Sequence, residues 1–318
     1  MKALVRDRYG DPGVLRVEEV ERPRLEDDRV LVRVRASSVN KADWYAVLGR
    51  PLFARPMMGG IFKPRSRQVG TDFAGVIEAV GKDVEGFAVG DEVFGGQTGA
   101  YAEYIAAKTV ARKPANVTFE AAGTIGIAGQ TALQALRDHG SLQPGERVLV
   151  NGASGGVGTM TVQIAKALGG HVTAVCSTRN VDRVRNLGAD RVIDYTGEDF
   201  TRTGDRYDVV IDVAGSRPWR ALRRVLAPGA RVVIVGAPSG TFFLGPLTHI
   251  AGMMIGSRGK ARFFVAKTKR DDLEILASLL ESRALTPAID ATYGLDEAPA
   301  ALKAFGEGHV RGKLVLTM

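Results

Sequence analysis

Short apolar stretches recur through the centre of the chain, and most are followed by apolar residues at helical spacing. The apolar stretches are residues 147–151, 171–177, 191–195, 207–215 and 230–236, and the helical patterns are residues 159–168, 181–187 and 219–226. A strand that is apolar along its whole length is buried on both faces, as in a parallel sheet covered by helices. The pattern therefore predicts an α/β domain with a doubly wound parallel sheet.

A glycine-rich turn, Asn151-Gly-Ala-Ser-Gly-Gly-Val-Gly158, joins the first of these strands to its helix. Such glycines make the tight turn, let a pyrophosphate approach the backbone and let the helix pack against the strand. The pyrophosphate then lies on free N–H groups at the helix N-terminus. This pattern predicts a Rossmann dinucleotide-binding site, with a plain turn in another α/β fold as the alternative. The residues assigned to the cofactor here are Gly152, Ala153, Ser154, Gly155, Gly156, Val157 and Gly158.

The end of the second strand indicates which dinucleotide is bound. An NAD enzyme usually has an acidic residue about twenty positions beyond the glycines, where it binds the ribose hydroxyls. Here that region reads Ser177-Thr-Arg179, and no acid follows before Asp182. Arg179 can pair with a 2′-phosphate, and Ser177 and Thr178 can donate hydrogen bonds to it. We therefore predict NADP(H) as the cofactor, unless Arg179 is only a solvated residue that opens the next helix.

The N-terminal part of the chain differs from the centre, because its short apolar segments alternate with glycine-rich turns. Many short strands punctuated by turns predict a compact domain of the β-barrel type. The last segment, residues 308–317, also reads as a strand and is expected to return to this domain. We therefore predict a discontinuous domain of residues 1–117 and 283–318, and a Rossmann domain of residues 118–282.

Composition narrows the class of protein. The chain has 318 residues, a formal net charge of +8 and a single cysteine, Cys176. Basic residues are dispersed, so an anionic cofactor explains the charge more simply than nucleic acid does. A single cysteine excludes intramolecular disulfides and multi-cysteine zinc sites. No apolar stretch is long enough for a membrane span, and charges near Met1 argue against a signal peptide, so cytoplasmic residence is expected.

Further motifs occur in a fixed order along nearly the whole chain. They are Val39-Asn-Lys-Ala-Asp43, Val69-Gly-Thr-Asp-Phe-Ala-Gly75, Val89-Gly-Asp-Glu-Val-Phe94, Gly99-Ala-Tyr-Ala-Glu-Tyr104, Ala128-Gly-Gln-Thr-Ala-Leu-Gln-Ala-Leu136, Leu187-Gly-Ala-Asp190 and Gly308-His-Val-Arg-Gly-Lys-Leu-Val-Leu316. In this order, together with the glycine turn, they resemble the medium-chain dehydrogenase/reductase superfamily, specifically its zinc-free quinone oxidoreductase (zeta-crystallin-like) branch. The resemblance implies a GroES-like β-barrel catalytic domain, a Rossmann domain and a homodimer.

The positions of the zinc ligands have other residues. Zinc alcohol dehydrogenases of this superfamily carry a catalytic Cys, a Gly-His-Glu motif and a four-cysteine lobe. Here Asn40 stands at the place of that Cys, Gly70-Thr-Asp72 replaces Gly-His-Glu, and the lobe is missing. The four histidines lie far apart in the sequence, without the spacing of zinc ligands. We therefore expect no metal.

Without zinc to polarise an isolated carbonyl, a conjugated molecule is the easier hydride acceptor. Its negative charge delocalises onto oxygen, so the protein needs only to donate hydrogen bonds there and to hold the nicotinamide at reacting distance. The resemblance thus implies an oxidoreductase acting on a quinone or an α,β-unsaturated ketone or aldehyde. An acyl thioester is less expected, because Arg50-Pro51 stands where the thioester reductases of this superfamily carry a tyrosine.

Asn40 and Tyr45 are the predicted catalytic residues, since zinc-free relatives have an Asn and a Tyr that face the nicotinamide at these positions. Asn40 would orient the ribose or the substrate. Tyr45 would donate to the substrate oxygen or relay a proton, although a packing role for Tyr45 stays open. Asp43 is expected to cap the helix or loop that begins there.

The remaining site residues are also assigned on the resemblance. The cofactor site would include Thr131, Tyr195, Val213, Gly236 and Lys313. Phe263 and Phe264 would line the acceptor pocket, although neighbouring residues of an extended strand cannot both face it.

Two other functions would account for parts of this sequence. A short-chain dehydrogenase is excluded by motif order, because Tyr104-Ile-Ala-Ala-Lys108 precedes the glycine turn whereas that family places its Tyr/Lys pair well after the glycines. A non-catalytic NADPH-binding protein stays open as the alternative, acting as a sensor, a crystallin-like store or a nucleic-acid binder.

Overall fold

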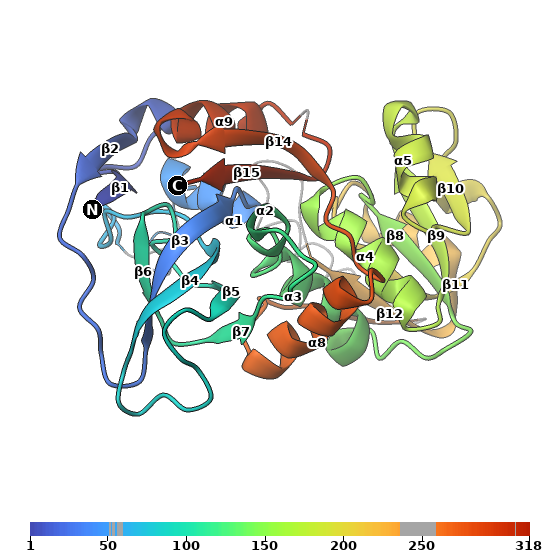
Figure 1. Cartoon of the computed structure of the whole chain (residues 1–318). Coiled ribbons are helices and arrows are strands. Elements are labelled where there is room, and N and C mark those ends of the chain that lie inside the picture. The colour runs from blue at the N-terminus through green and yellow to red at the C-terminus, as the bar shows by residue number, and fades with distance from the viewer. Residues whose placement is uncertain (51, 53–54, 56–59, 236–258, 309) are drawn as a thin grey trace. The chain divides into compact units, whose positions relative to one another are not determined.

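The computed structural model describes residues 1–318 except 51, 53–54, 56–59, 236–258 and 309 (Figure 1). It divides into two compact units, of which the first comprises Met1–Gln130 and Thr268–Met318 and the second Thr131–Lys267. The domain boundaries predicted from the sequence lie at 117/118 and 282/283. The structure thus assigns residues 118–130 and 268–282 to the first unit.

The second unit contains a parallel sheet, whose strand order in the described part of the chain is β10-β9-β8-β11-β12-β13. The strands are β8 (Arg147–Asn151), β9 (His171–Cys176), β10 (Arg191–Asp194), β11 (Tyr207–Asp212), β12 (Leu226–Ile234) and β13 (Gly259–Phe263). The order reverses between β8 and β11, and in doubly wound sheets ligands bind at the carboxyl ends of the strands beside such a reversal. This confirms the predicted doubly wound parallel sheet.

Helices and short turns connect these strands, and apolar side chains fill the space between them. The helices are α4 (Gly156–Ala167), α5 (Val181–Asn186) and α6 (Trp219–Leu222), and the 3-10 turns are η4 (Thr178–Asn180), η5 (Phe200–Arg202) and η6 (Arg223–Val225). Leu149, Val210 and Val232 come from neighbouring strands and are fully buried in one apolar core. Their burial explains why the strands are apolar along their length.

The first unit is built on a mixed sheet of seven described strands, with the order β14-β15-β3-β4-β5-β7 and with β6 paired to β3. The strands are β3 (Val30–Ser38), β4 (Asp72–Val80), β5 (Glu92–Gly96), β6 (Tyr104–Ala107), β7 (Val110–Arg112), β14 (Ile289–Gly294) and β15 (Lys313–Thr317). A separate hairpin pairs β1 (Lys2–Val5) with β2 (Arg16–Glu19). The β-rich N-terminal domain expected from the turn pattern is this sheet.

The end of the chain returns to the N-terminal part of this unit (Figure 1). Strand β15 runs antiparallel to β3, with Val315 opposite Ser38. The backbone N–H of Val39 donates to the carbonyl of Leu314 at 2.9 Å. This pairing brings Lys313, the first residue of β15, next to the end of β3.

Helices cover parts of the first unit. They are α1 (Lys41–Leu48), α2 (Phe119–Ala122), α8 (Arg270–Glu281) and α9 (Ala298–Gly306), with the 3-10 turns η1 (Pro12–Val14) and η7 (Leu295–Glu297). Helix α3 (Ala128–Gln134) crosses the unit boundary and continues into a π-helical turn, η3 (Ala135–His139). Among the described residues, no helix is long and apolar enough to cross a membrane.

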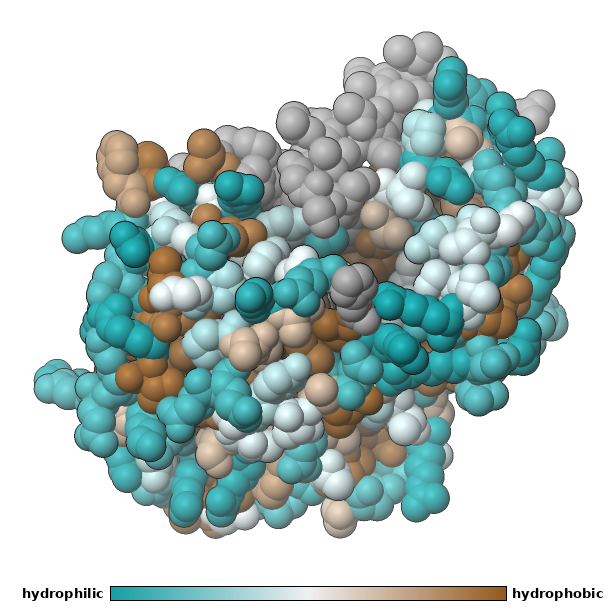
Figure 2. Space-filling model, turned by 90° about the horizontal axis from the view of Figure 1, so that it is seen from above, coloured by the Kyte–Doolittle hydropathy of each residue, from teal (hydrophilic) through white to brown (hydrophobic). Residues whose placement is uncertain are grey.

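Basic and acidic side chains form ion pairs on the described surface. Figure 2 shows polar residues across the viewed face, with apolar residues between them. Many basic residues face an acid; Arg16 and Arg67, for example, both contact Asp7 and Glu18. Such pairs balance part of the basic charge locally on the described surface.

Candidate active site and cofactor-binding turn

Asn40 lies at the junction where β3 ends and α1 begins. Its backbone N–H donates to Oδ2 of Asp43 at 2.9 Å. The first N–H groups of a helix have no partner within the helix, so a carboxylate in the first turn stabilises this end. Asp43 therefore caps the helix, as the sequence predicted, and Asn40 is held at a fixed point of the backbone.

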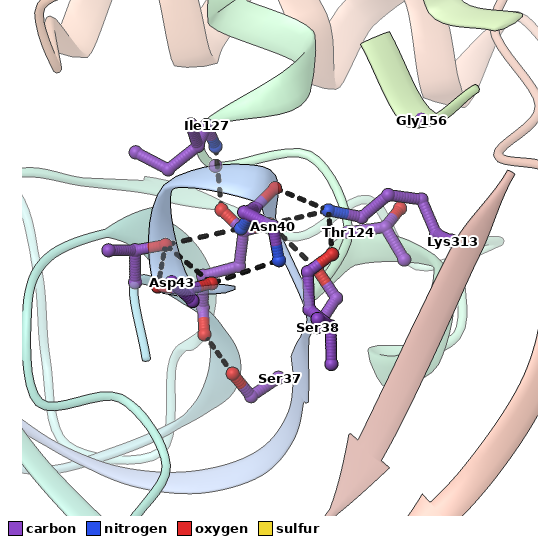
Figure 3. Close-up of polar contacts among 12 residues, drawn as sticks. Ser37, Ser38, Asn40, Asp43, Thr124, Ile127, Gly156 and Lys313 are labelled. Carbon is purple, nitrogen blue, oxygen red and sulfur yellow. Dashed lines mark hydrogen bonds and ion pairs between the residues drawn. The ribbon is translucent and has the colours of Figure 1, made fainter. Parts of the chain in front are cut away.

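The side chain of Asn40 is held by three polar neighbours (Figure 3). Its Nδ2 donates to Oδ2 of Asp72 at 2.8 Å and to Oγ1 of Thr71 at 3.1 Å. Its Oδ1 accepts from Nζ of Lys313 at 2.6 Å. An ammonium can only donate and a carboxylate can only accept, so these neighbours also fix which amide atom is nitrogen. Both N–H groups of the amide are therefore used.

Lys313 and Asp72 form a buried ion pair. Nζ of Lys313 lies 3.1 Å from Oδ2 of Asp72, and the two side chains are 2% and 0% exposed. The ammonium also donates to Oδ1 of Asn40 and, at 3.3 Å, to the carbonyl of Val39. These three bonds account for its three N–H groups. Lys313, predicted from sequence to bind the cofactor, is thus fully engaged inside the first unit.

The Asp72 carboxylate receives further hydrogen bonds from the surrounding chain. Its Oδ1 accepts from the backbone N–H of Ile127 at 2.6 Å, and its Oδ2 accepts from Oγ of Ser38 at 2.7 Å. The Ser37 hydroxyl donates to the backbone carbonyl of Asp72. A buried charge is tolerated only when it is paired and hydrogen-bonded, and Asp72 satisfies both conditions.

Asp43 is the second buried carboxyl of the site. Tyr101 donates to its Oδ2 at 3.0 Å, and Thr71 donates to its Oδ1 at 3.0 Å. Complete burial, reinforced by the negative charge of Asp72, raises the pKa of Asp43 to about 6. Burial, then the charge of Asp43, raises the pKa of the Tyr101 phenol well above its usual value. The site therefore holds one buried ion pair and one carboxyl, Asp43, that titrates near neutrality.

Tyr45 lies on the same helix as Asn40 and Asp43. Its side chain is 4% exposed, and Nζ of Lys41, one helical turn earlier, lies 5.9 Å from the centre of its ring. Burial lowers the pKa of Lys41. A cation over an aromatic ring is attracted by the ring's negative face. The structure thus places a basic group beside the tyrosine that the sequence nominated as a proton donor.

The glycine turn of the second unit has the backbone that a phosphate site requires. Gly152 has a φ of +89°, which other residues rarely adopt. A Cβ on Gly158 would lie 2.1 Å from the carbonyl oxygen of Gly152, so close packing of helix and turn requires glycine there. A Cβ on Gly155 would approach nothing nearer than 3.8 Å, so the space over this residue is open. That open space adjoins the N-terminus of α4, where anions bind.

The other predicted residues of this turn are buried or partly exposed, and Val213 is hydrogen-bonded to the residue that precedes the turn. Ala153 is fully buried, and Ser154, Gly156 and Val157 are partly exposed. Val213 follows β11, and its backbone N–H donates to the carbonyl of Asn151 at 2.9 Å. The residues therefore fit a dinucleotide that would lie with its phosphates on the turn.

Residues at the end of β9 are exposed where a cofactor ribose is expected. Thr178 and Arg179 are exposed and Ser177 is partly exposed. The side chain of Tyr195, which follows β10, is 52% exposed. Asp194 lies opposite Cys176 in the β9–β10 pairing, so an acid from the next strand reaches this end of the sheet.

The structure separates the two phenylalanines that were assigned to the acceptor pocket. Phe263 packs against the apolar core of the second unit. Phe264 stacks on His139, with ring centres 4.1 Å apart and planes inclined by 26°. Thr131 is partly exposed on α3, and the predicted cofactor residue Gly236 lies outside the described residues. Because Phe263 packs against the core, Phe264 is the better candidate of the two phenylalanines for contact with a ligand.

Sequence reasoning missed two residues of these sites. Asp72 was recognised only as part of the sequence Gly70-Thr-Asp72 that replaces Gly-His-Glu. An acid still stands at the third position of that motif although the histidine is absent, and this was a usable signal. Asp194 ends the third strand, whereas the acid that binds the ribose in NAD enzymes usually follows the second. Its position at the end of the third strand could have been used.

The donor types at the zinc-ligand positions are an amide, a hydroxyl and a carboxylate already paired with an ammonium. Zinc prefers thiolate and imidazole ligands. Within the described ranges, no group of three or more His, Cys, Asp or Glu side chains could hold a metal ion.

Comparison with known proteins gives consistent matches over the chain. Residues 26–114 match the alcohol dehydrogenase GroES-like domain, and residues 187–316 match a family described as zinc-binding dehydrogenase. The chain is 32% identical over 336 residues to the chloroplastic quinone-oxidoreductase QR1 of Triphysaria versicolor, which covers 99% of this chain and 98% of that protein.

Two further matches come from a plant and a bacterium. The 2-methylene-furan-3-one reductase of Solanum lycopersicum is 32% identical, over 99% of this chain and 79% of that protein. The crystal structure of Escherichia coli quinone oxidoreductase complexed with NADPH has a TM-score of 0.84 at 25% identity, over 100% of both chains.

Proposed function

This chain belongs to the medium-chain dehydrogenase/reductase superfamily, in its quinone oxidoreductase-like branch, and we propose that it is an NADPH-dependent oxidoreductase that reduces a conjugated acceptor without zinc. The acceptor is a quinone or an α,β-unsaturated ketone or aldehyde. The names of relatives support this class, since they include a quinone oxidoreductase and a reductase of an unsaturated furanone.

The observation that carries the cofactor part of the proposal is the glycine turn between β8 and α4. Open space over Gly155 meets the N-terminus of a twelve-residue helix, beside the reversal of strand order in a parallel sheet. These are the requirements for holding a pyrophosphate. The nicotinamide, when bound, supplies the hydride.

Zinc independence is supported by the ion pair at the zinc-ligand positions. A cation placed next to Asp72 would face the Lys313 ammonium, which already lies 3.1 Å from the carboxylate. Asn40 and Thr71 offer an amide and a hydroxyl, which are weak zinc ligands. Without a Lewis acid, an acceptor whose charge delocalises by conjugation is the suitable substrate.

The residues of the first unit then have separate roles. Asn40 donates both of its side-chain N–H groups to Asp72 and Thr71. Its Oδ1 is therefore the atom that we assign to accept a hydrogen bond from a hydroxyl of the bound ribose or substrate. Tyr45 is the residue we assign as donor to the oxygen on which charge develops. Lys313 and Asp72 act through Asn40 by fixing its orientation.

The test is the loss of NADPH absorbance with the purified protein and four acceptors: an ortho-quinone, a para-quinone, an enone and a simple ketone. Turnover of a conjugated acceptor, with none of the ketone, is expected, and the chelator EDTA should leave the rate unchanged. Turnover of the ketone or loss of activity with EDTA would contradict the proposal. Tight NADPH binding without turnover of any acceptor would indicate the non-catalytic sensor or store.

A homodimer and cytoplasmic residence stay predictions from the resemblance and the sequence. The name of the relative QR1 places that protein in the chloroplast. Sedimentation of the purified protein at micromolar concentration would measure the oligomeric state directly.

A further inference from the structure

The end of β10 carries an acid into the region expected to bind the adenosine ribose. Strands β9 and β10 are parallel neighbours, with Asp194 opposite Cys176. Cys176 is the residue just before Ser177 and Thr178, which were assigned to the 2′-phosphate. An acid is thus present at this end of the sheet, although it comes from the third strand rather than the second.

The Asp194 carboxylate is linked to Thr178 through a hydroxyl. Oγ1 of Thr196 lies 2.7 Å from Oδ1 of Asp194 and 2.8 Å from Oγ1 of Thr178. Hydrogen bonds from Thr178 and from the backbone and side chain of Thr196 hold the pKa of the Asp194 carboxyl below its usual value. Asp194 is therefore ionised at neutral pH and can only accept hydrogen bonds.

The ionised state of Asp194 determines how the hydroxyls of Thr196 and Thr178 use their protons. Because Asp194 only accepts, Thr196 must use its single proton on Asp194. The Thr178 hydroxyl must then use its own proton on Thr196 or on the Asp194 carboxylate, with which it also forms a hydrogen bond. The Thr178 hydroxyl therefore donates its proton to an acceptor within the protein, so it can only accept a hydrogen bond from a ligand.

A hydroxyl that only accepts suits one cofactor better than the other. The ribose 2′-hydroxyl of NADH can donate to Thr178, whereas the 2′-phosphate of NADPH at neutral pH carries close to two negative charges and only accepts. The nearby charge of Asp194 adds repulsion toward that phosphate. Arg179, adjacent to Thr178 and exposed, acts in the opposite direction.

We propose that Asp194, through Thr196 and Thr178, is a specificity-determining residue that limits the preference for NADPH and keeps NADH usable. Cofactor choice is then a balance between Arg179, which attracts the 2′-phosphate, and Asp194, which opposes it. The inference rests on the proposed function, because it requires the cofactor to lie on the turn between β8 and α4.

The experiment measures binding of two fragments that report on this end of the site alone, 5′-AMP and 2′,5′-ADP. Isothermal titration gives their dissociation constants for the wild-type protein and for Asp194→Asn. The side-chain oxygen of Asn can keep the turn bond from the Thr196 backbone N–H, which lies 3.0 Å from Oδ1 of Asp194. Asp194→Ser is a second variant that removes the charge and retains a turn-forming oxygen.

The expected result is a fall of about fivefold or more in the ratio of the 2′,5′-ADP constant to the 5′-AMP constant in either variant. The fall should shrink in high salt, because the charges are exposed. Asp182→Asn is the matched control, since that side chain is 92% exposed and contacts Arg185. The ratio should not change in this control.

Two outcomes would overturn the inference. An unchanged ratio in both Asp194 variants, with NADPH still bound, would remove Asp194 from cofactor selection and leave the proposed function intact. Failure of the wild-type protein to bind NADPH and NADH would overturn the proposed function together with this inference. The kcat/KM values for NADPH and NADH with one quinone give a second readout, in which Asp194→Asn should favour NADPH.

Discussion

Nζ of Lys313, near the end of the chain, lies 2.6 Å from Oδ1 of Asn40, and both side chains are more than nine-tenths buried. This contact fixes the orientation of the Asn40 amide, because an ammonium can bond only to its oxygen. It also joins the last strand of the chain to the start of α1. The position of the predicted catalytic asparagine therefore depends on a residue 273 positions away in sequence.

Replacing Lys313 tests how much of the site depends on this contact. Lys313→Met leaves the Asp72 carboxylate buried without its ion-pair partner, so we expect a loss of about 3–5 kcal/mol in the free energy of unfolding, measured with denaturant. The double variant Lys313→Met/Asp72→Asn removes both charges and should recover part of the loss. If the single and double variants are equally unstable, the ion pair is not the source of the cost.

The raised pKa of Asp43 predicts a pH dependence of stability. A pKa of about 6 in the folded protein, against 3.8 for an ordinary aspartate, means that the folded state holds the extra proton between these values. Its contribution to the free energy of unfolding is therefore greatest below pH 4 and is lost as the pH rises through 6, by about 3 kcal/mol.

The measurement for Asp43 compares denaturant unfolding of the wild-type protein and Asp43→Asn at pH 4.5 and pH 7.5. Surface carboxyls with lowered pKa values, such as Asp7 and Glu18, act in the opposite direction but are present in both proteins. The difference between the two proteins isolates Asp43. Equal slopes with pH would show that Asp43 is ionised throughout.

The local pattern of apolar residues in the sequence was sufficient to predict the parallel sheet. Apolar strands, intervening helices and the glycine turn each depend on neighbouring residues, and all appear in the structure near their predicted positions. The ends of helices and strands differ from their predicted positions where packing determines them. For example, the pattern predicted a helix from Trp219 to Leu226, whereas α6 ends at Leu222 and a 3-10 turn leads into β12.

The polar contacts of the site could not be read from local pattern. Asp72 and Lys313 are 241 residues apart, and only the pairing of β15 with β3 brings them together. Asp194 reaches the end of β9 for a similar reason, since the register of two strands places it there. Motif spacing identifies residue types along the chain, whereas these relationships arise from strand pairing.

Tyr45→Phe tests the proposed proton donor. The variant removes only the hydroxyl from a side chain that is 4% exposed, so the fold should be retained. We expect kcat to fall by more than tenfold, with the dissociation constant for NADPH nearly unchanged, because the hydroxyl is assigned to the acceptor oxygen. An unchanged kcat would leave Tyr45 as a packing residue.

Arg179→Ala tests the other side of cofactor selection. Loss of a charge-assisted bond to a 2′-phosphate costs about 1.5–3 kcal/mol, so the KM for NADPH should rise about ten- to a hundredfold. The KM for NADH should stay nearly the same, because NADH lacks that phosphate. Equal losses with both cofactors would assign Arg179 a structural role at the start of α5.

Two glycines of the turn give a matched pair of variants that separates cofactor binding from folding. A Cβ at Gly155 would meet nothing nearer than 3.8 Å, so Gly155→Ala should keep the melting temperature of the wild-type protein. It would occupy the open space beside the N-terminus of α4, and we expect NADPH binding to weaken by at least tenfold.

Gly158→Ala should behave differently, because its Cβ would lie 2.1 Å from the carbonyl oxygen of Gly152 and must displace the backbone. We expect a loss of stability of about 1–3 kcal/mol or more. Thermal unfolding and NADPH titration, applied to both variants, measure the two effects separately. If Gly155→Ala binds NADPH as tightly as the wild-type protein does, the phosphates do not lie over this glycine, and the assignment of the turn to the cofactor is wrong.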